Sequence, residues 1–456
     1  MSIYRVVNPY TGETVKEYPT ATDEQIRESI ARAQAAFEPW STRPLHERVE
    51  VLQRTAQAFF DRKEELAEII HIEMGKPMDQ AVGEAEFSGE IIKYYADNAE
   101  EFLADEILKN RAGVNARVKK AAQGVVLGIM PWNFPYYQVA RFAMPNLILG
   151  NTVLLKHAGQ CPWSATTIAE ILRDAGLPEG AYENIFATNE QIADIVIPDP
   201  VVRGVSLTGS ERAGAAVASV AGKHLKKVVL ELGGSDPFIV AGTSDLEAAA
   251  AAAVEGKMEN SGQACNASKR FIVIDEQYDE FVQKISEAIA ALKVGEPADG
   301  DALVGPLSSQ MAADGLRAQA ASAVAEGAQV IVGEIPAEGD TRIAPALLAG
   351  ITETMNAYSE ELFGPIATVY RAKDADDAVR IANDSPFGLG ARIWADDLEL
   401  ARSMADRLDV GMVSINGAMG EDYDMPFGGV KRSGFGRELG PHGMEEFMNR
   451  KLVVEP

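Results

Sequence analysis

The chain has 456 residues, of which 46% are hydrophobic and 24% are charged, so its composition is that of an ordinary globular protein rather than a disordered or fibrous one. At about 150 residues per domain, this length suggests about three structural units. The formal net charge is −26, and so acidic a surface argues against nucleic acid or an anionic membrane as a partner.

Several expected features of other protein classes are missing from the sequence. The amino terminus shows no basic segment followed by an apolar one, and no apolar run reaches the length of about 18 residues needed to span a membrane. Two cysteines cannot form a disulfide framework. We therefore expect a cytoplasmic protein. The histidines and cysteines form no zinc-ligand pattern, so no metal is expected.

The first part of the chain is predicted to be helical. From residue 22 to residue 106, apolar residues recur every three or four positions with charges between them. Two strands are predicted next, because 114–120 alternates between polar and apolar residues and 124–130 is a short apolar run. Short strands then alternate with longer helices, at 152–156, 164–175, 204–207, 211–221 and 227–232.

A second alternating series begins near Phe238. We expect helices at 245–259, 276–292 and 375–383, strands at 270–274, 329–332 and 367–370, and a tail at 445–454 that passes from helix into strand. Short apolar strands between helices of about a dozen residues are typical of doubly wound parallel sheets. The sequence therefore predicts an α/β protein with two Rossmann-like domains.

Four places on this frame contain residues suited to chemistry. Cys265 follows a helix and has small and amide neighbours, which leave a thiol accessible and can donate to an oxyanion. Glu231 ends an apolar strand beside two glycines, where a carboxylate can act as a general base. Asn133 lies between two prolines, and the turn at 209–214 can present backbone amides to a pyrophosphate. Taken singly, each feature also has a purely structural interpretation.

Six motifs that occur in one order resemble those of the aldehyde dehydrogenase superfamily over essentially the whole chain. They are PWNFP at 131–135, LTGS at 207–210, LELGG at 230–234, GQAC at 262–265, ELFGP at 361–365 and PFGGVKRSGFGRE at 426–438. The resemblance implies a cofactor-binding domain (1–103 and 123–233), a catalytic domain (234–432) and a small β arm for oligomerisation (104–122 and 448–456). It also implies a homodimer or a homotetramer.

The resemblance further implies a role for each catalytic residue. Cys265 would attack the aldehyde carbon and later carry the acyl group as a thioester, and Glu231 would activate the water that releases the acid. Asn133 would join the backbone amide of Cys265 in the oxyanion hole. Glu438 matches a second family glutamate, which can relay protons from Glu231.

Cofactor binding follows from the same resemblance, which predicts NADP or NAD. The matching residues are Trp132, Lys156, Gly159, Gly209, Ser210, Leu232, Glu361 and Phe363. Lys156 and Glu361 match family residues that bind the adenosine ribose and the nicotinamide-side ribose. Many relatives that prefer NAD have a glutamate where this chain has Gly159, and a carboxylate there would repel a 2′-phosphate. Its absence favours NADP.

The identity of the aldehyde is predicted less directly. The chain looks most like the short bacterial succinate semialdehyde dehydrogenase branch, in which an arginine at the position of Arg141 binds the substrate carboxylate. Arg141 is the only cation that we place at the aldehyde tunnel from the sequence. Glu259 and the acidic loop 420–424 lie at positions expected to flank the same tunnel, and they favour a cationic aminoaldehyde or a broad aliphatic specificity instead.

Two other function classes remain as alternatives. A CoA-acylating aldehyde dehydrogenase would pass the acyl group to CoA, but that branch often lacks the glutamate that is present here as Glu231. A non-enzymatic structural protein with the same fold has no need of Cys265, Glu231 and Asn133, all of which are present. We therefore expect oxidation of a small-molecule aldehyde with water as the acyl acceptor.

Overall fold

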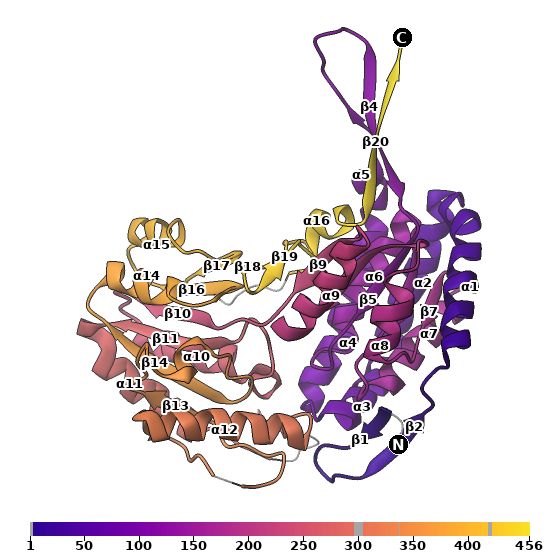
Figure 1. Ribbon diagram of the computed structural model, residues 1–456. Coiled ribbons are helices and arrows are strands. Elements are labelled where there is room, and N and C mark those ends of the chain that lie inside the picture. The colour runs from indigo at the N-terminus through magenta and orange to yellow at the C-terminus, as the bar shows by residue number, and fades with distance from the viewer. Residues whose placement is uncertain (1–2, 296–303, 337, 418–421) are drawn as a thin grey trace.

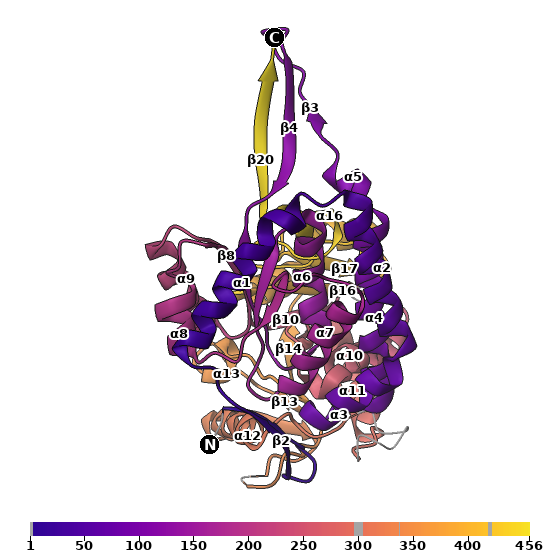
Figure 2. The same ribbon diagram turned by 90° about the vertical axis from the view of Figure 1, so that its right-hand side faces the viewer.

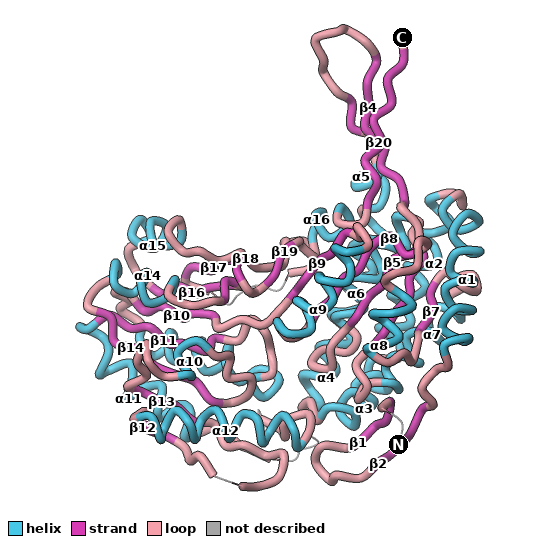
Figure 3. Tube along the Cα trace, viewed as in Figure 1, coloured by secondary structure: helices cyan, strands magenta, loops and turns pink. Residues whose placement is uncertain are grey.

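The computed structural model describes residues 3–295, 304–336, 338–417 and 422–456. The chain forms two lobes, and a long ribbon of strands projects from one of them (Figure 1). Each lobe is built around its own mainly parallel sheet, with helices on the sheet faces (Figure 3). No helix within the described ranges is both long enough and apolar enough to cross a membrane.

The first lobe contains a six-stranded sheet with the order β19-β9-β8-β5-β6-β7, in which β19 alone runs antiparallel to its neighbour. Its strands are β5 (Val125–Ile129), β6 (Thr152–Lys156), β7 (Tyr182–Asn184), β8 (Val202–Thr208), β9 (Lys227–Glu231) and β19 (Gly434–Phe435). The strand order reverses between β5 and β8. Ligands of doubly wound sheets bind beyond the carboxyl ends of the strands at such a reversal, where residues 130–135 and 209–210 lie.

Helices pack on both faces of this sheet (Figure 2). They are α1 (Asp23–Ser41), α2 (Leu45–Asp61), α3 (Lys63–Met74), α4 (Met78–Asp97), α5 (Ala99–Leu103), α6 (Tyr137–Leu149), α7 (Pro162–Asp174), α8 (Asn189–Gln191), which continues as a π-helix at Ile192–Val196, and α9 (Glu211–Lys223). Helix α6 packs against α2 and α4, and every one of its residues is buried. It is therefore the central helix of this lobe.

The second lobe contains a seven-stranded sheet with the order β12-β13-β14-β11-β10-β16-β17, parallel except between β12 and β13. Its strands are β10 (Asp236–Val240), β11 (Ser268–Ile274), β12 (Gln329–Val332), β13 (Ala346–Ala349), β14 (Ile366–Ala372), β16 (Gly390–Trp394) and β17 (Met412–Ile415). Its helices are α10 (Leu246–Met258), α11 (Asp275–Ala290), α12 (Gln310–Glu326), α13 (Asn356–Ser359), α14 (Ala375–Asn383) and α15 (Leu398–Ala405).

The projecting ribbon is a three-stranded sheet of β3 (Glu106–Ile107), β4 (Asn115–Ala122) and β20 (Met448–Glu455) (Figures 1 and 2). β20 pairs antiparallel with β4 along its whole length and follows the short helix α16 (Gly440–Glu445). The described residues also form two small antiparallel pairs, β1 (Tyr4–Val7) with β2 (Thr14–Tyr18) and β15 (Phe387–Gly388) with β18 (Val430–Lys431).

The predicted α/β class with two doubly wound sheets is confirmed. The sequence did not indicate helix α6, since a helix that is buried on all sides shows no amphipathic period and α6 also contains Pro145. Strands β1 and β2 were not predicted either. They lie before the helical region, and every residue of β2 except the last is exposed, so β2 lacks the alternation of a half-buried strand.

Candidate active site

The loop that carries Cys265 has an unusual backbone. Helix α10 ends at Met258, and a single 3-10 turn spans Glu259–Gly262. Within that turn Asn260 (φ 49°) and Ser261 (φ 57°) are left-handed, a conformation that side chains other than glycine seldom adopt. Cys265 follows and is half-buried, so its thiol is not sealed from solvent.

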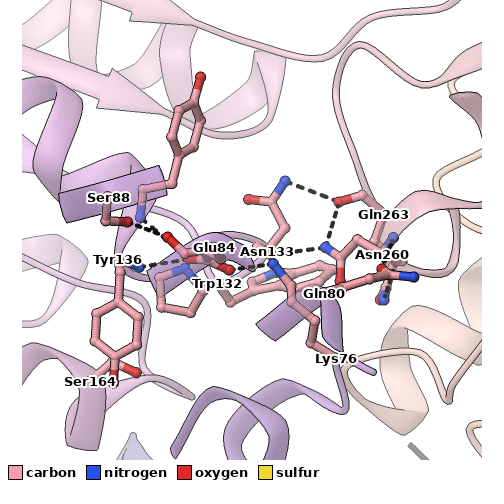
Figure 4. Close-up of polar contacts among 12 residues, drawn as sticks. Lys76, Gln80, Glu84, Ser88, Trp132, Asn133, Tyr136, Ser164, Asn260 and Gln263 are labelled. Atoms are coloured by element: carbon pink, nitrogen blue, oxygen red, sulfur yellow. Dashed lines mark hydrogen bonds and ion pairs between the residues drawn. The ribbon is translucent and has the colours of Figure 1, made fainter. Parts of the chain in front are cut away.

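Asn133 lies in the loop after β5 and is bonded to the nucleophile loop in both directions (Figure 4). Its Nδ2 donates to the carbonyl of Gln263 at 3.0 Å, and Nδ2 of Asn260 donates to the carbonyl of Asn133 at 2.8 Å. An amide nitrogen carries two N–H groups, so the bond to Gln263 leaves Asn133 one further donor. The two segments that the motifs singled out therefore lie together, with an amide donor beside the segment that ends in Cys265.

A buried ion pair lies beneath the Asn133 loop and was not foreseen from the sequence. Lys76 pairs with Glu84, and their side chains are 1% and 2% exposed. The other oxygen of Glu84 accepts from the backbone N–H of Tyr136 at 2.8 Å (Figure 4), and the Lys76 ammonium lies 3.6 Å from the ring centroid of Phe134. The available signal was the pair of polar residues at 80 and 84, since a spacing of four places them on one face of α4, which begins just after Lys76.

Glu231 ends strand β9 and is 2% exposed. Neither oxygen of its carboxylate has a hydrogen-bond partner among the residues that the structure describes. Burial raises the pKa of Glu231 well above its usual range, and Glu438 raises it further, while Arg141 acts in the opposite direction. A buried carboxyl with free oxygens and a raised pKa has the properties of a general base that waits for a water molecule.

Arg141 lies on α6, and the structure shows a partner for it that the sequence did not indicate. Its side chain is 0% exposed and forms an ion pair with Glu438, which also accepts from the Ser206 hydroxyl at 2.9 Å. Burial lowers the pKa of Arg141, but Glu438, Tyr137, Glu231 and Cys265 together raise it above the usual value. The guanidinium is thus already paired within the site, and its contact with a substrate carboxylate stays a prediction.

The second cysteine has the opposite surroundings. Cys161 is 0% exposed, and its thiol points toward the carbonyl of Trp132 at 3.8 Å. Burial raises the pKa of the Cys161 thiol well above its usual value. A buried thiol with a raised pKa forms little thiolate, which is the reactive form.

The predicted cofactor residues lie around the carboxyl ends of β6, β8 and β9. Lys156 ends β6, and its ammonium has no hydrogen bond or ion pair among the described residues, although burial lowers its pKa. Ser210 caps helix α9, where its hydroxyl accepts from the backbone N–H of Ala213, and Gly209 precedes it. Leu232 packs against Gly214 of α9. A Cβ added to Gly214 would lie 2.7 Å from the methyl carbons of Leu232, so the glycine lets α9 approach the sheet closely.

Gly159 is held in place by the amino-terminal hairpin. Its carbonyl accepts from the backbone N–H of Arg5 at 3.0 Å, and an added Cβ would lie 2.6 Å from the carbonyl oxygen of Ile3. A glutamate at this position would therefore clash with backbone as well as change charge. Packing is sufficient to explain the glycine.

Glu361 and Phe363 approach the same region from the second lobe. Glu361 accepts from the backbone N–H of Gly234 at 3.1 Å and pairs with Lys269 at 3.1 Å. The ring of Phe363 packs edge-on against Trp132, with centroids 5.8 Å apart. Residues expected to contact one cofactor thus come from both lobes and meet between the sheets.

Comparison with known proteins identifies the family. The family model described as "Aldehyde dehydrogenase family" matches residues 2–453 of the chain. The chain belongs to the aldehyde dehydrogenase family. It is therefore an oxidoreductase that acts on aldehydes.

Several members of the family are similar over the full length. A succinate-semialdehyde dehydrogenase (NADP+) of Deinococcus radiodurans is 50% identical, with 99% of this chain and 94% of that protein covered. Another with the same name, numbered 1, from Mycobacterium ulcerans is 42% identical, with 98% of each covered. The crystal structure of succinic semialdehyde dehydrogenase from Streptococcus pyogenes in complex with NADP+ matches with a TM-score of 0.96 at 37% identity, covering 99% of this chain and 100% of that one.

Two pockets of this aldehyde dehydrogenase share Gln80 and Glu259 as walls, and the smaller one adjoins the Asn133 loop. The smaller, of about 280 Å³, is also lined by Lys76, Phe134 and Tyr137. The larger, of about 630 Å³, is also lined by Arg392 and Asp79. Besides Arg141, the cation that the sequence placed at the tunnel, Lys76 and Arg392 thus lie at the walls of these two pockets.

The acidic residues expected near the tunnel are only partly placed. Glu259 lies on the shared wall of the two pockets and is exposed. In the acidic loop, Asp422 and Asp424 are exposed and Tyr423 is half-buried, while Gly420 and Glu421 lie outside the described residues. Partial desolvation raises the pKa of Glu259 above its usual value. The positive charges of Lys76 and Arg392 offset part of that rise.

Proposed function

We propose that this aldehyde dehydrogenase oxidises succinate semialdehyde to succinate and prefers NADP+. The observation that carries the substrate is the relationship itself, since proteins 42–50% identical over at least 98% of this chain are named for this reaction. The alternative hypothesis of an aminoaldehyde substrate rests on the exposed carboxylates of Glu259, Asp422 and Asp424. The cations of Lys76 and Arg392 lie near Glu259 and offset its negative charge, which weakens that hypothesis.

Acylation in this proposal depends on Cys265 and Asn133. The Cys265 thiolate attacks the aldehyde carbon, and the free N–H of Asn133 and the backbone N–H of Cys265 stabilise the oxyanion that forms. The bonds between Asn133, Asn260 and Gln263 support this role, because they fix the amide beside the nucleophile loop. Bound NADP+ supplies the hydride acceptor for the oxidation.

Release of the acid depends on Glu231. Its free carboxylate oxygens can take a proton from water, and the hydroxide equivalent then attacks the Cys265 thioester. Glu438, which lies close enough to Glu231 to raise its pKa, is proposed to pass that proton onward. Formation of acyl-CoA in the presence of CoA would contradict this hydrolytic route.

The residues around β6 fit NADP+. Lys156 is a half-buried cation without a partner among the described residues, and an anionic ligand would neutralise a charge that is partly shielded from water. We propose that Lys156 holds the 2′-phosphate and adenosine ribose, that Gly209, Ser210 and the start of α9 hold the pyrophosphate, and that Glu361 holds the other ribose. Trp132, Leu232 and Phe363 are proposed to line the cleft.

The domain roles and the assembly follow as proposals. The six-stranded sheet of the first lobe is proposed to carry the cofactor, the seven-stranded sheet of the second lobe to carry the nucleophile, and the projecting ribbon to join subunits in a homodimer or homotetramer. The exposed apolar side chains of Leu452 (60%) and Val454 (55%) on β20 support the last proposal. The cytoplasmic location stays a prediction, which cell fractionation would check.

One kinetic panel tests the substrate and the cofactor together. Succinate semialdehyde, butanal and 4-aminobutanal are each supplied with NADP+ and with NAD+, and kcat/KM is measured for every pair. We expect succinate semialdehyde with NADP+ to exceed the other aldehydes by about tenfold or more. Higher values with 4-aminobutanal would establish the aminoaldehyde alternative, and equal values for all three would establish a broad aliphatic enzyme.

A further inference from the structure

Helix α4 contacts both of the loops that form the proposed oxyanion hole. The side-chain oxygen of Gln80 accepts from the backbone N–H of Asn260 at 2.8 Å, in the loop of the nucleophile. One helical turn later, Glu84 accepts from the backbone N–H groups of Tyr136 and Tyr137, at 2.8 and 3.3 Å, directly after the Asn133 loop. One rigid face of α4 therefore reaches both loops (Figure 4).

The contact to Asn260 falls where the nucleophile loop is most strained. Asn260 and Ser261 are consecutive left-handed residues with side chains, each of which costs about 1 kcal/mol or more. Such a conformation persists only where its surroundings hold it. Here the Asn260 amide donates to Gln80, and the Ser261 hydroxyl accepts from the backbone N–H of Gly305 at 2.9 Å.

The contact to Tyr136 and Tyr137 falls at the start of α6. The first N–H groups of a helix have no partner within the helix, and a carboxylate there is favoured by the helix dipole. Glu84 supplies that carboxylate from within the core, and Lys76 neutralises its charge. Glu84 therefore attaches the start of α6 to α4, and with it the Asn133 loop that leads into α6.

We infer that Gln80 and Glu84 are positioning residues, and that α4 sets the distance between the Cys265 loop and the Asn133 loop. The inference rests on the proposed aldehyde oxidation. Neither side chain needs to touch the substrate. Each side chain holds a backbone segment, and together they keep the oxyanion donors aligned with the carbon that Cys265 attacks. A displacement of such donors by about 1 Å can lower a rate by about 100-fold.

Substitution of Gln80 tests the first contact. Gln80→Met keeps the shape of the side chain but removes the acceptor, Gln80→Glu keeps an acceptor oxygen, and Gln53→Met makes the same change on the exposed surface of α2. The rate constant of the first-turnover NADPH burst is measured with succinate semialdehyde. We expect Gln80→Met to lower it by about tenfold or more with an unchanged Kd for NADP+, Gln80→Glu to recover most of it, and Gln53→Met to match the unchanged chain.

A double-mutant cycle separates positioning from general destabilisation. If Gln80 acts through the oxyanion geometry, its substitution must matter less once Asn133→Ala has removed the amide donor, so the two losses combine to less than their product. Should Gln80→Met fail to fold, Gln80→Ala takes its place in the same cycle. A burst of normal rate in the folded variant, equal damage from Gln80→Glu, or fully multiplicative losses would each overturn the inference.

Glu84 requires a charge-neutral design, because removing one member of a buried ion pair leaves the other unpaired. Lys76→Met with Glu84→Gln keeps an acceptor for the Tyr136 N–H, whereas Lys76→Met with Glu84→Met does not. We expect the first double variant to keep a burst at least about tenfold faster than the second. Equal rates would overturn the role of Glu84. Absence of any oxidation by the unchanged chain would instead refute the proposed function, and the positioning role with it.

Discussion

The two thiols of the chain lie in different surroundings. Cys265 is half-buried at the end of a strained loop, whereas Cys161 is fully buried with a raised pKa. We expect Cys265→Ala to abolish turnover and to leave NADP+ binding intact, because only the covalent step is lost. Cys161→Ala should keep turnover near normal. Steady-state rates and a cofactor titration of both variants check this, and an essential Cys161 would refute the assignment of the nucleophile.

Glu231 governs the second half of the proposed reaction. Glu231→Gln should still give one turnover of NADPH and then stop at the thioester, since the base for water is missing. In the unchanged chain the raised pKa keeps Glu231 protonated at low pH, so deacylation should accelerate as pH rises through that pKa. Stopped-flow burst and steady-state rates across pH measure both effects. Loss of the burst itself in Glu231→Gln would place the residue before acylation.

Substitution of Arg141 distinguishes a structural ion pair with Glu438 from a contact with the substrate carboxylate. Removal of its charge leaves Glu438 buried without its partner, and an unpaired buried carboxylate is strongly unfavourable. We therefore expect Arg141→Ala to lower kcat for butanal as well as for succinate semialdehyde. A higher KM for succinate semialdehyde with an unaltered kcat for butanal would show that Arg141 binds the substrate carboxylate after all.

At this scale, the sequence indicated Cys265, Glu231 and Asn133 through the order of six motifs, whereas each residue taken singly also had a structural interpretation. The partner of Arg141 was not visible. Glu438 lies near the other end of the chain, and the two meet only because β19 adds to the sheet beside β9 and brings the following residues against α6. Pairings of this kind depend on topology, which residue spacing does not encode.

Among the elements, the end of β6 is joined to the Asn133 loop by a buried histidine. Nδ1 of His157 accepts from the backbone N–H of Ala158 at 2.8 Å, and Nε2 lies 3.0 Å from the carbonyl of Pro135, to which it donates. This arrangement satisfies the neutral ring, since both nitrogens of a protonated ring are donors. Burial lowers the pKa of His157 from 6.5 to about 4.

This histidine should make the protein sensitive to acid. The unfolded chain takes up the proton near pH 6.5, whereas the folded chain resists it down to about pH 4, so folding stability falls across that interval by up to about 3 kcal/mol. We expect His157→Gln to lose less stability on acidification. Urea denaturation at several pH values measures this, with His46→Gln on the surface as control, and parallel curves for the two variants would argue against it.

How well an element could be predicted depended on its exposure. Helices such as α2 and α14 have one polar face and one apolar face, so their spacing reveals them. Helix α6 is apolar on every side and resembles a broken apolar run. The inward polar face of α4, with half-buried Gln80 and buried Glu84, also escaped notice, because polar residues at helical spacing are normally expected to face water.

For the whole molecule, the ribbon of β3, β4 and β20 is the feature that a single subunit does not explain. It projects from the first lobe and exposes Ile107, Leu452 and Val454. We expect deletion of residues 452–456 to lower the assembly state, because it removes half of β20 and its apolar side chains. Light scattering of both proteins measures this. A monomer in the full-length protein would contradict the proposed role of the ribbon.

The pairing of distant segments also determines when the first lobe can be finished during synthesis. Its sheet receives β19, its central helix receives the counter-ion Glu438, and the ribbon receives β20, all from residues 434–455, which are synthesised after the second lobe. If the first lobe folded before then, Arg141 would be buried without its counter-ion and β9 would have an open edge. Amino-terminal domains often fold first during translation. Here the first lobe must wait for residues 434–455, so fragments that end before them should be removed by proteases.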